Sequence, residues 1–173
     1  YMDIPIRGPV MIHDIAITGK NVIFNDLPLQ FNLNNAALGK NVFVYNKKMS
    51  SRYGIMDKYN KDKSQIQWFD LPNHYVYHYV NAWDSKNENG EDIVTMFGCV
   101  RPNVNLEYKH KNNPYDPNEK EHPFLWESPD ADEGAKLTKF IFNRTTGESE
   151  MVQLLDIVSD FPVINMDLMG YET

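Results

Sequence analysis

Histidine is the residue type whose placement in this sequence points most directly to chemistry. The chain holds five histidines. Two of them stand among largely apolar neighbours: His13 within VMIHDIAIT (10–18) and His78 within HYVYHYVNAWD (74–84). Histidine is the most common metal ligand, and imidazole suits iron, copper, zinc and nickel. These two residues are therefore either core histidines whose ring nitrogens bond to backbone groups, or ligands that the fold brings to one metal ion.

The remaining histidines have plainer explanations. His110 and His122 lie in a polar stretch, where solvated side chains are expected. His74 follows Pro72 and Asn73 at the start of an expected strand, which predicts exposure at an edge or turn. The gap of 65 positions between the other two is too long for a local ligand motif such as HExxH. Only the tertiary fold could bring them together.

Short strands separated by turns are the elements expected to position these histidines. In a strand, alternation places Tyr77 and His78 on opposite faces. Turn signals at TGKN (18–21), NENG (87–90) and RTTGES (144–149) predict hairpins, and LNNAALGK (33–40) could hold one helical turn. The expected strands are Met11–Thr18, Asn21–Asp26, Val42–Asn46, Ile66–Phe69, Tyr75–Val80, Ile93–Gly98, Lys136–Asn143 and Ser149–Leu155.

Eight strands in meander order predict an all-β fold, either a sandwich or a propeller. With about four strands to a blade, the chain holds about two blades, which cannot close a ring by themselves. Residues 107–135 are polar and contain four prolines, so a long loop or insertion is expected there. The chain begins at Tyr1 without an initiator Met and ends abruptly at GYET. We therefore expect a piece of a larger propeller.

Composition narrows the function classes. The 173 residues carry a net charge of −7, from 17 basic and 24 acidic side chains, which argues against nucleic-acid binding. The single cysteine, Cys99, excludes an internal disulfide and a zinc site built of cysteines, and is expected to be a small buried residue. No apolar run approaches the length of a membrane span. The motifs GxSxG, GxGxxG and the P-loop are absent from the sequence.

One carboxylate differs from the many in loops. Asp160, in SDFPVIN (159–165), borders an apolar segment. On local grounds alone, a turn or capping residue before Phe161 and Pro162 is the expected role.

Three stretches of the sequence resemble the carotenoid cleavage oxygenase family. They are PVMIHDIAITGKNVIFNDLPLQF (9–31), RYGIMDKYNKD with IQWFDLPNHYVYHYVNAWD (52–62 and 66–84), and SDFPVIN (159–165), in the order found in that family. The resemblance runs through most of the chain and leaves out 107–135. It implies a seven-bladed β-propeller, of which residues 1–173 would form part of a single domain.

The resemblance also implies a metal site. Family members hold Fe(II) on the propeller axis with four histidines, and His13 and His78 match two of them. The other two ligands have no counterpart in this chain, in agreement with the expected truncation. Asp160 matches an acidic position that would accept a hydrogen bond from His78, fixing its tautomer and aiming its other nitrogen at the metal. Tyr77 and Phe161 match positions near an apolar substrate tunnel.

The reaction implied is oxidative cleavage of a conjugated C=C bond. An Fe2+-dependent dioxygenase would use O2 to split a carotenoid or apocarotenoid into two carbonyl products. Peripheral membrane contact is compatible with this substrate, because polyenes reside in lipid, and both cytoplasmic and plastid-like compartments are compatible with the resemblance. Two alternatives remain open: a stilbene-cleaving oxygenase with the same iron centre, and a non-catalytic propeller that binds apolar ligands.

Overall fold

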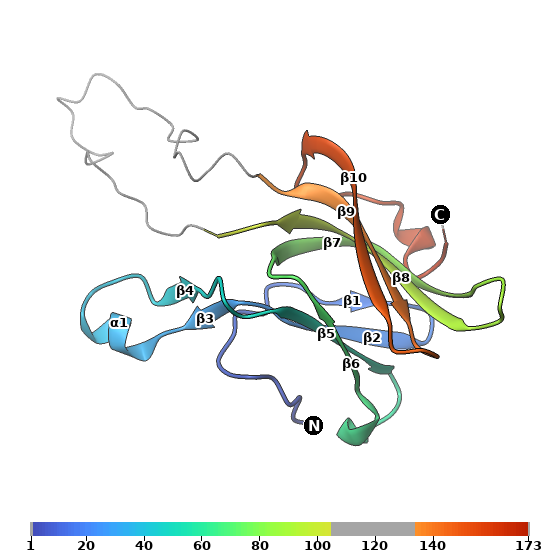
Figure 1. Cartoon of the computed structure of the whole chain (residues 1–173), viewed down its shortest axis with the longest axis horizontal. Helices are drawn as coiled ribbons and strands as arrows, with labels where there is room; N and C mark the ends of the chain where they lie inside the picture. Colours follow the sequence, from blue (N-terminus) through green and yellow to red (C-terminus); the bar gives the residue numbers. More distant parts are fainter. Residues whose placement is uncertain (1, 105–133, 173) are drawn as a thin grey trace.

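Strands are the predominant regular element of the structure, a computed structural model that describes residues 2–104 and 134–172 (Figure 1). In chain order the elements are β1 (Ala16–Ile17), β2 (Asn21–Asp26), β3 (Leu29–Phe31), α1 (Leu33–Ala37), β4 (Phe43–Tyr45), β5 (Ser51–Asp57), η1 (Lys63–Gln65), β6 (Gln67–Leu71), β7 (Tyr75–Lys86), β8 (Asp92–Arg101), β9 (Lys136–Asn143), β10 (Ser149–Val158) and η2 (Met166–Leu168).

Two four-stranded antiparallel sheets form the body of the molecule. Their strand orders are β1-β2-β5-β6 and β10-β9-β8-β7. A separate two-stranded ladder of β3 and β4, with α1 between them, projects to the left in Figure 1. The predicted all-β class is confirmed, and the two meandering four-stranded sheets are the size and topology of two propeller blades.

The two sheets pack through a shared apolar core. Tyr53 and Ile55 of one sheet, with Tyr75, Phe140 and Phe142 of the other, are among its fully buried side chains. The edge strands β1 and β7 also lie against each other. Most of β2 and β9 buries alternate side chains, as the period-two pattern of the sequence predicts for a strand with one buried face.

Most predicted strands are present, but β3 and β5 were missed. Gly54 lies in the middle of β5, and a glycine weakens the sequence signal for a strand. The structure shows why the glycine is there. A Cβ at this position would lie 2.8 Å from Cγ2 of Ile66 and 2.9 Å from the ring of Trp68. The missing side chain therefore makes room for the tryptophan of the neighbouring strand.

The prediction of a strand over Met11–Thr18 is largely wrong, because only Ala16–Ile17 pair as a strand. Met11 donates its N–H to the carbonyl of Leu29 in β3, at 2.8 Å, whereas Ala16 pairs with β2. The segment between them passes from one ladder to another, so it forms no ladder of its own. His13 lies in this crossing segment, not on a strand face.

The predicted turns and the helical turn are confirmed. Gly90 and Gly147 have φ values of +78° and +83° in the β7–β8 and β9–β10 hairpins, a conformation that glycine adopts without strain. Asn32 caps α1 by accepting the N–H of Asn34 at 3.0 Å. Apart from its last two residues, the loop predicted at 107–135 lies outside the described residues. In the described parts of the chain, no helix is long and apolar enough to cross a bilayer.

Candidate metal-ligand site

His78 is carried by an irregular part of β7. Between Val76 and Tyr79 the chain advances three residues while its partner in β8 advances two, and a second extra residue lies between Tyr79 and Asn81. These are β-bulges, which break the regular alternation and redirect side chains. The expectation that Tyr77 points away from the face of His78 is therefore wrong: both rings contact His13.

A glycine on the neighbouring strand accommodates the bulges. Gly98 pairs with Tyr79, and a Cβ on Gly98 would lie 3.1 Å from the ring of Tyr79 and 3.3 Å from Cγ1 of Val76. The absent side chain leaves room for the residues on each side of the bulge. A glycine within a strand often marks such a place.

The two histidines selected from the sequence lie side by side. The ring centroids of His13 and His78 are 5.2 Å apart, with an interplanar angle of 83°. His13 is exposed, and the His78 side chain is 24% exposed. Neither is a core histidine bonded to backbone groups, so that interpretation of the sequence is wrong for both.

A carboxylate engages one ring nitrogen of His78. Nδ1 of His78 lies 2.7 Å from Oδ1 of Asp160. The other oxygen, Oδ2, accepts from Nη2 of Arg101 at 2.9 Å, and Oδ1 also accepts the Phe161 N–H at 2.9 Å. Because an ionised carboxylate can only accept, Nδ1 carries a proton, and in the neutral ring Nε2 is then the nitrogen with the lone pair. Asp160 therefore both accepts a hydrogen bond from the next residue in its turn, as the sequence predicts, and contacts His78.

The electrostatic surroundings favour the ionised form of Asp160. Burial by itself raises the pKa of this carboxyl. The hydrogen bonds from His78, Arg101 and the backbone N–H of Phe161, together with the charge of Arg101, outweigh burial and hold the pKa below its ordinary value. Asp160 is consequently a stable hydrogen-bond acceptor for His78.

Two aromatic rings flank the histidine pair. The ring centroid of Tyr77 lies 5.5 Å from that of His13, and the centroid of Phe161 lies 4.6 Å from that of His78. Phe161 is 77% exposed and adopts a φ of +54°. For a bulky residue this left-handed conformation is an outlier that costs about 1–3 kcal/mol and tends to occur at functional sites.

His74 does not belong to this group, and the prediction that it is exposed is wrong. It is 2% exposed. Nε2 lies 2.8 Å from the hydroxyl of Tyr53, and Nδ1 lies 2.7 Å from the carbonyl of Pro72. Burial lowers the pKa of His74 from 6.5 to about 4. Both nitrogens are used within the protein, so none remains for a ligand.

The geometry of the pair fits a shared metal ion. Metal–imidazole bonds are about 2.1 Å long, so two imidazoles on one ion have ring centres about 4.5–5.5 Å apart. The pair of His13 and His78 falls in that range. Within residues 2–104 and 134–172, no group of three or more His, Cys, Asp or Glu side chains could hold a metal. The described residues therefore bring two imidazoles close together without completing a metal site.

The sequence alone does not single out Arg101 or Tyr53, since no local motif marks them. Arg101 is the last residue of β8, and its guanidinium reaches Asp160 across the sheet edge. An arginine opposite a carboxylate can be found only when both are placed in space. Cys99, by contrast, is buried as predicted, and burial raises the pKa of its thiol.

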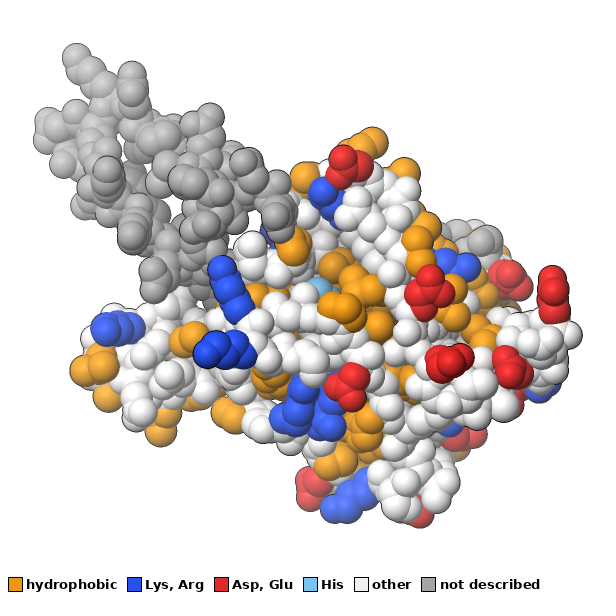
Figure 2. Space-filling model, viewed as in Figure 1, with side chains coloured by type: hydrophobic (Ala, Val, Ile, Leu, Met, Phe, Trp, Pro, Cys, Tyr) orange, Lys and Arg blue, Asp and Glu red, His pale blue; other side chains and the backbone are white. Residues whose placement is uncertain are grey.

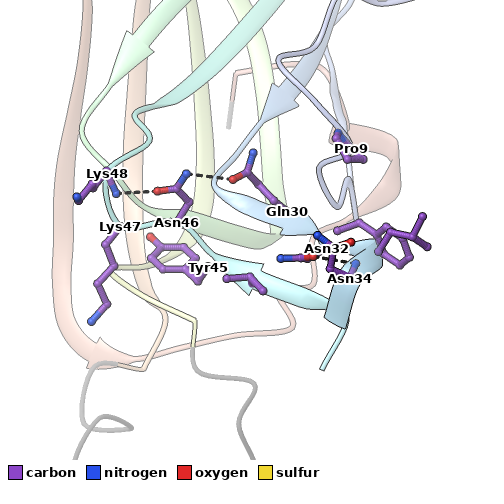
Figure 3. A pocket seen from close by; sticks show the side chains of 11 residues that line it. Pro9, Gln30, Asn32, Asn34, Tyr45, Asn46, Lys47 and Lys48 are labelled. Atoms are coloured by element: carbon purple, nitrogen blue, oxygen red, sulfur yellow. Dashed lines mark hydrogen bonds between the residues drawn. The ribbon is translucent and has the colours of Figure 1, made fainter. Parts of the chain in front are cut away.

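Other surface features lie apart from the histidines. A hollow of about 590 Å³ between β3, α1 and β4 is lined by Gln30, Asn32, Asn46 and Lys48, among others, and by neither histidine (Figure 3). Figure 2 shows apolar side chains reaching the surface at many places, interspersed with charged ones. The lining of the hollow mixes amide and lysine side chains with apolar ones such as Phe31 and Leu33.

Comparison with known proteins gives consistent matches. The family model described as RPE65, retinal pigment epithelial membrane protein, matches residues 1–173. A carotenoid 9,10(9',10')-cleavage dioxygenase 1 from Pisum sativum is 33% identical over 173 residues, covering 96% of this chain and 28% of the relative. The carotenoid 9,10(9',10')-cleavage dioxygenase of Crocus sativus is 35% identical, covering 94% of this chain and 27% of the relative.

Solved structures share the fold. The lignostilbene dioxygenase of Pseudomonas brassicacearum superposes with a TM-score of 0.71 at 20% identity, covering 95% of this chain and 31% of that protein. Cobalt-substituted Synechocystis ACO gives a TM-score of 0.68 at 16% identity, with the same coverage. This chain thus spans less than a third of the length of the relatives it matches.

Proposed function

Since this chain belongs to the RPE65 family, retinal pigment epithelial membrane protein, we propose that the protein that carries it is an Fe2+-dependent dioxygenase. Its proposed reaction is the cleavage of a conjugated C=C bond of a carotenoid or apocarotenoid by O2, giving two carbonyl products. The substrate class is proposed from the relatives that are at least 30% identical, which are named as carotenoid cleavage dioxygenases.

The observation that carries this proposal is the pairing of His13 with His78, backed by Asp160. The two rings are 5.2 Å apart, and the carboxylate is 2.7 Å from Nδ1 of His78. An imidazole with a carboxylate on its far nitrogen is the common arrangement of a metal-bound histidine. The cobalt-substituted structure among the similar folds also supports a metal.

His13 and His78 would hold the iron in this proposal, and the two ligands that complete the set would come from outside residues 1–173. Bound there, iron(II) would supply the chemistry that activates O2. The protein's own part would be to hold the imidazoles in the orientation that directs a ring nitrogen to the ion. Asp160 does this for His78 by accepting a hydrogen bond from Nδ1–H, which in the neutral ring leaves Nε2 as the nitrogen with a free lone pair.

Arg101 in turn holds the Asp160 carboxylate in place. Its guanidinium is bonded to Oδ2 of Asp160 and lies 5.8 Å from the ring of Tyr77. The ion pair leaves Oδ1 to face the histidine, so the carboxylate cannot rotate without breaking a charged contact. The orientation of the His78 ring is thereby coupled to the end of β8.

The aromatic side chains suit an apolar, flat substrate. Phe161 presents most of its ring to the surface beside His78, and Tyr77 lies beside His13. Polyenes bind through flat apolar contacts, and rings of this kind offer such contacts while excluding water. We therefore propose that Tyr77 and Phe161 border the bound substrate.

The decisive experiment uses the protein at its natural length. Purified protein is analysed for iron and incubated aerobically with a panel of carotenoids, apocarotenoids and stilbenes, and the products are identified by mass spectrometry. We expect about one iron per protein and paired carbonyl products from a carotenoid or apocarotenoid. Cleavage of stilbenes alone would replace the substrate class, and an iron-free protein that binds polyenes without cleaving them would overturn the enzymatic proposal.

A further inference from the structure

Asp14 follows His13 in the chain, and its side chain reaches the strand that carries His78. Its Oδ2 accepts the backbone N–H of Tyr79 at 3.0 Å, and its Oδ1 accepts the N–H of Ile15 at 2.8 Å. The residue after one histidine is thus bonded to the residue after the other.

The N–H of Tyr79 lies within the bulged part of β7, where regular pairing with β8 is interrupted. A backbone N–H in such a place needs another acceptor, or folding leaves it unpaired at a cost of about 1–3 kcal/mol. The Asp14 carboxylate supplies that acceptor. The bulge that turns His78 is therefore held by a residue of the segment that carries His13.

A buried amide reinforces the connection. Asn25 is 1% exposed, and its Nδ2 donates to the carbonyl of Asp14 at 2.7 Å and to the hydroxyl of Tyr79 at 2.9 Å. Asn25 of β2 is thereby bonded to both Asp14 and Tyr79, the two residues that are bonded to each other. The crossing segment before β1 has no ladder of its own, so these bonds substitute for one.

We propose that Asp14 is a positioning residue that sets the separation of the two imidazoles by tying the His13 segment to the bulge at Tyr79. This inference rests on the proposed function, because the separation of His13 and His78 matters only if the two residues bind one metal ion. Both carboxylate oxygens of Asp14 accept backbone N–H groups, so its proposed action on the metal is indirect. It acts through the backbone, by holding His13 at the distance from His78 that one ion requires.

The chain offers a matched control at the other end of the same two elements. Asp84 of β7 accepts the backbone N–H of Lys20 at 3.1 Å and also bonds the side chain of Asn21. It therefore joins β7 to the β1–β2 turn as Asp14 joins the segment before β1 to β7. A merely structural carboxylate would behave alike at both places, whereas positioning of the histidines is expected only of Asp14.

The test measures Co2+ binding to the metal-free protein at its natural length, alone and as Asp14→Ala, Asp14→Asn and Asp84→Ala. The dissociation constant comes from titration, and the visible absorption bands of bound cobalt report the ligand geometry. We expect Asp14→Ala to bind cobalt about 10-fold or more weakly, with shifted bands, as is typical for lost ligand-orienting contacts. Asp14→Asn retains an oxygen for the Tyr79 N–H, so part of the affinity should return.

Asp84→Ala is expected to match the wild type in affinity and spectrum even where its thermal stability falls. Equal cobalt binding by wild type and Asp14→Ala would overturn the positioning role while leaving the proposed function intact. A wild type that takes up no cobalt would overturn both. If Asp14→Ala does not fold, Asp14→Asn is compared with Asp84→Asn, and identical affinities and spectra for that pair would overturn the inference.

Discussion

His74 and His78 lie four positions apart in one aromatic stretch, yet their surroundings have little in common. His74 is buried between the rings of Tyr53 and Phe140, with a hydroxyl on one nitrogen and a carbonyl on the other. His78 is partly exposed, beside His13, with a carboxylate on Nδ1. Within the described residues, no hydrogen bond engages its Nε2.

The difference shows how the same side chain is assigned two roles. At His74 the hydrogen bonds and the low pKa fit a neutral ring that joins strands within the core. At His78 the charged partner and the unused nitrogen fit a metal ligand. The number of ring nitrogens that the protein itself uses separates the two cases, and residue type and local sequence do not.

The largest expected effect comes from removing the partly exposed histidine. His78→Ala should reduce iron content to background and abolish cleavage, because one of the two proposed ligands in this chain is lost. Metal analysis and product formation in the full-length protein measure it. His74→Gln is the matched control and should keep its iron. A purified His78→Ala protein with full iron and full turnover would rule out this ligand.

Removing the carboxylate partner of His78 should have the next largest effect. Asp160→Ala is expected to weaken metal affinity about 10–100-fold, because the ring loses the group that fixes its tautomer and orientation. Competition with a chelator measures the affinity. Asp156→Ala removes an exposed carboxylate paired with Lys136 and serves as the control. Equal affinities in the two variants would contradict the role given to Asp160.

His74 predicts a dependence of stability on pH. The pKa is about 4 in the folded protein and 6.5 ordinarily, so the unfolded chain binds the extra proton between these values. The neutral His74 therefore contributes fully to the free energy of unfolding above pH 6.5, and this contribution is lost as the pH falls towards 4. Between pH 7 and pH 5 the loss is about 2 kcal/mol. Urea unfolding of the metal-free wild type and of His74→Gln measures the difference. Parallel pH profiles for the two proteins would refute the assignment.

The smallest expected effect concerns the ring beside His78. Phe161 has a φ of +54°, which glycine tolerates and alanine does not. Both Phe161→Gly and Phe161→Ala remove the exposed ring and should raise KM for a polyene. The glycine variant should be more stable than the alanine variant by about 1 kcal/mol. Chemical denaturation of the pair tests this, and equal stabilities would show that the backbone relaxes at this position.

Much of the fold could be predicted because its signals are local. Turn residues marked the three hairpins, and alternation marked most strands. Prediction failed where a long-range contact overrode the local pattern. Gly54 weakened the signal of β5 in order to admit Trp68, and the segment around His13 crosses between ladders instead of forming a strand.

The candidate site also contains residues that the sequence marks and residues that only the structure reveals. Motifs resembling a known family selected His13, His78 and Asp160, and their role on a metal stays a prediction. Two bulges placed Tyr77 against the expectation from alternation, and no pattern in the sequence marked Arg101 or the contact made by Asp14. Such residues are recognised only by their partners, which lie many positions away.

The sequence by itself determined the strand content, the hairpins and the residue types able to bind a metal, since these depend on neighbours within a few positions. The tertiary structure alone decided which histidine is sealed in the core and which faces a second imidazole. The physical reason is that burial and hydrogen-bond partners are properties of positions in space. Residues 65 apart in the chain meet only after two sheets have packed together.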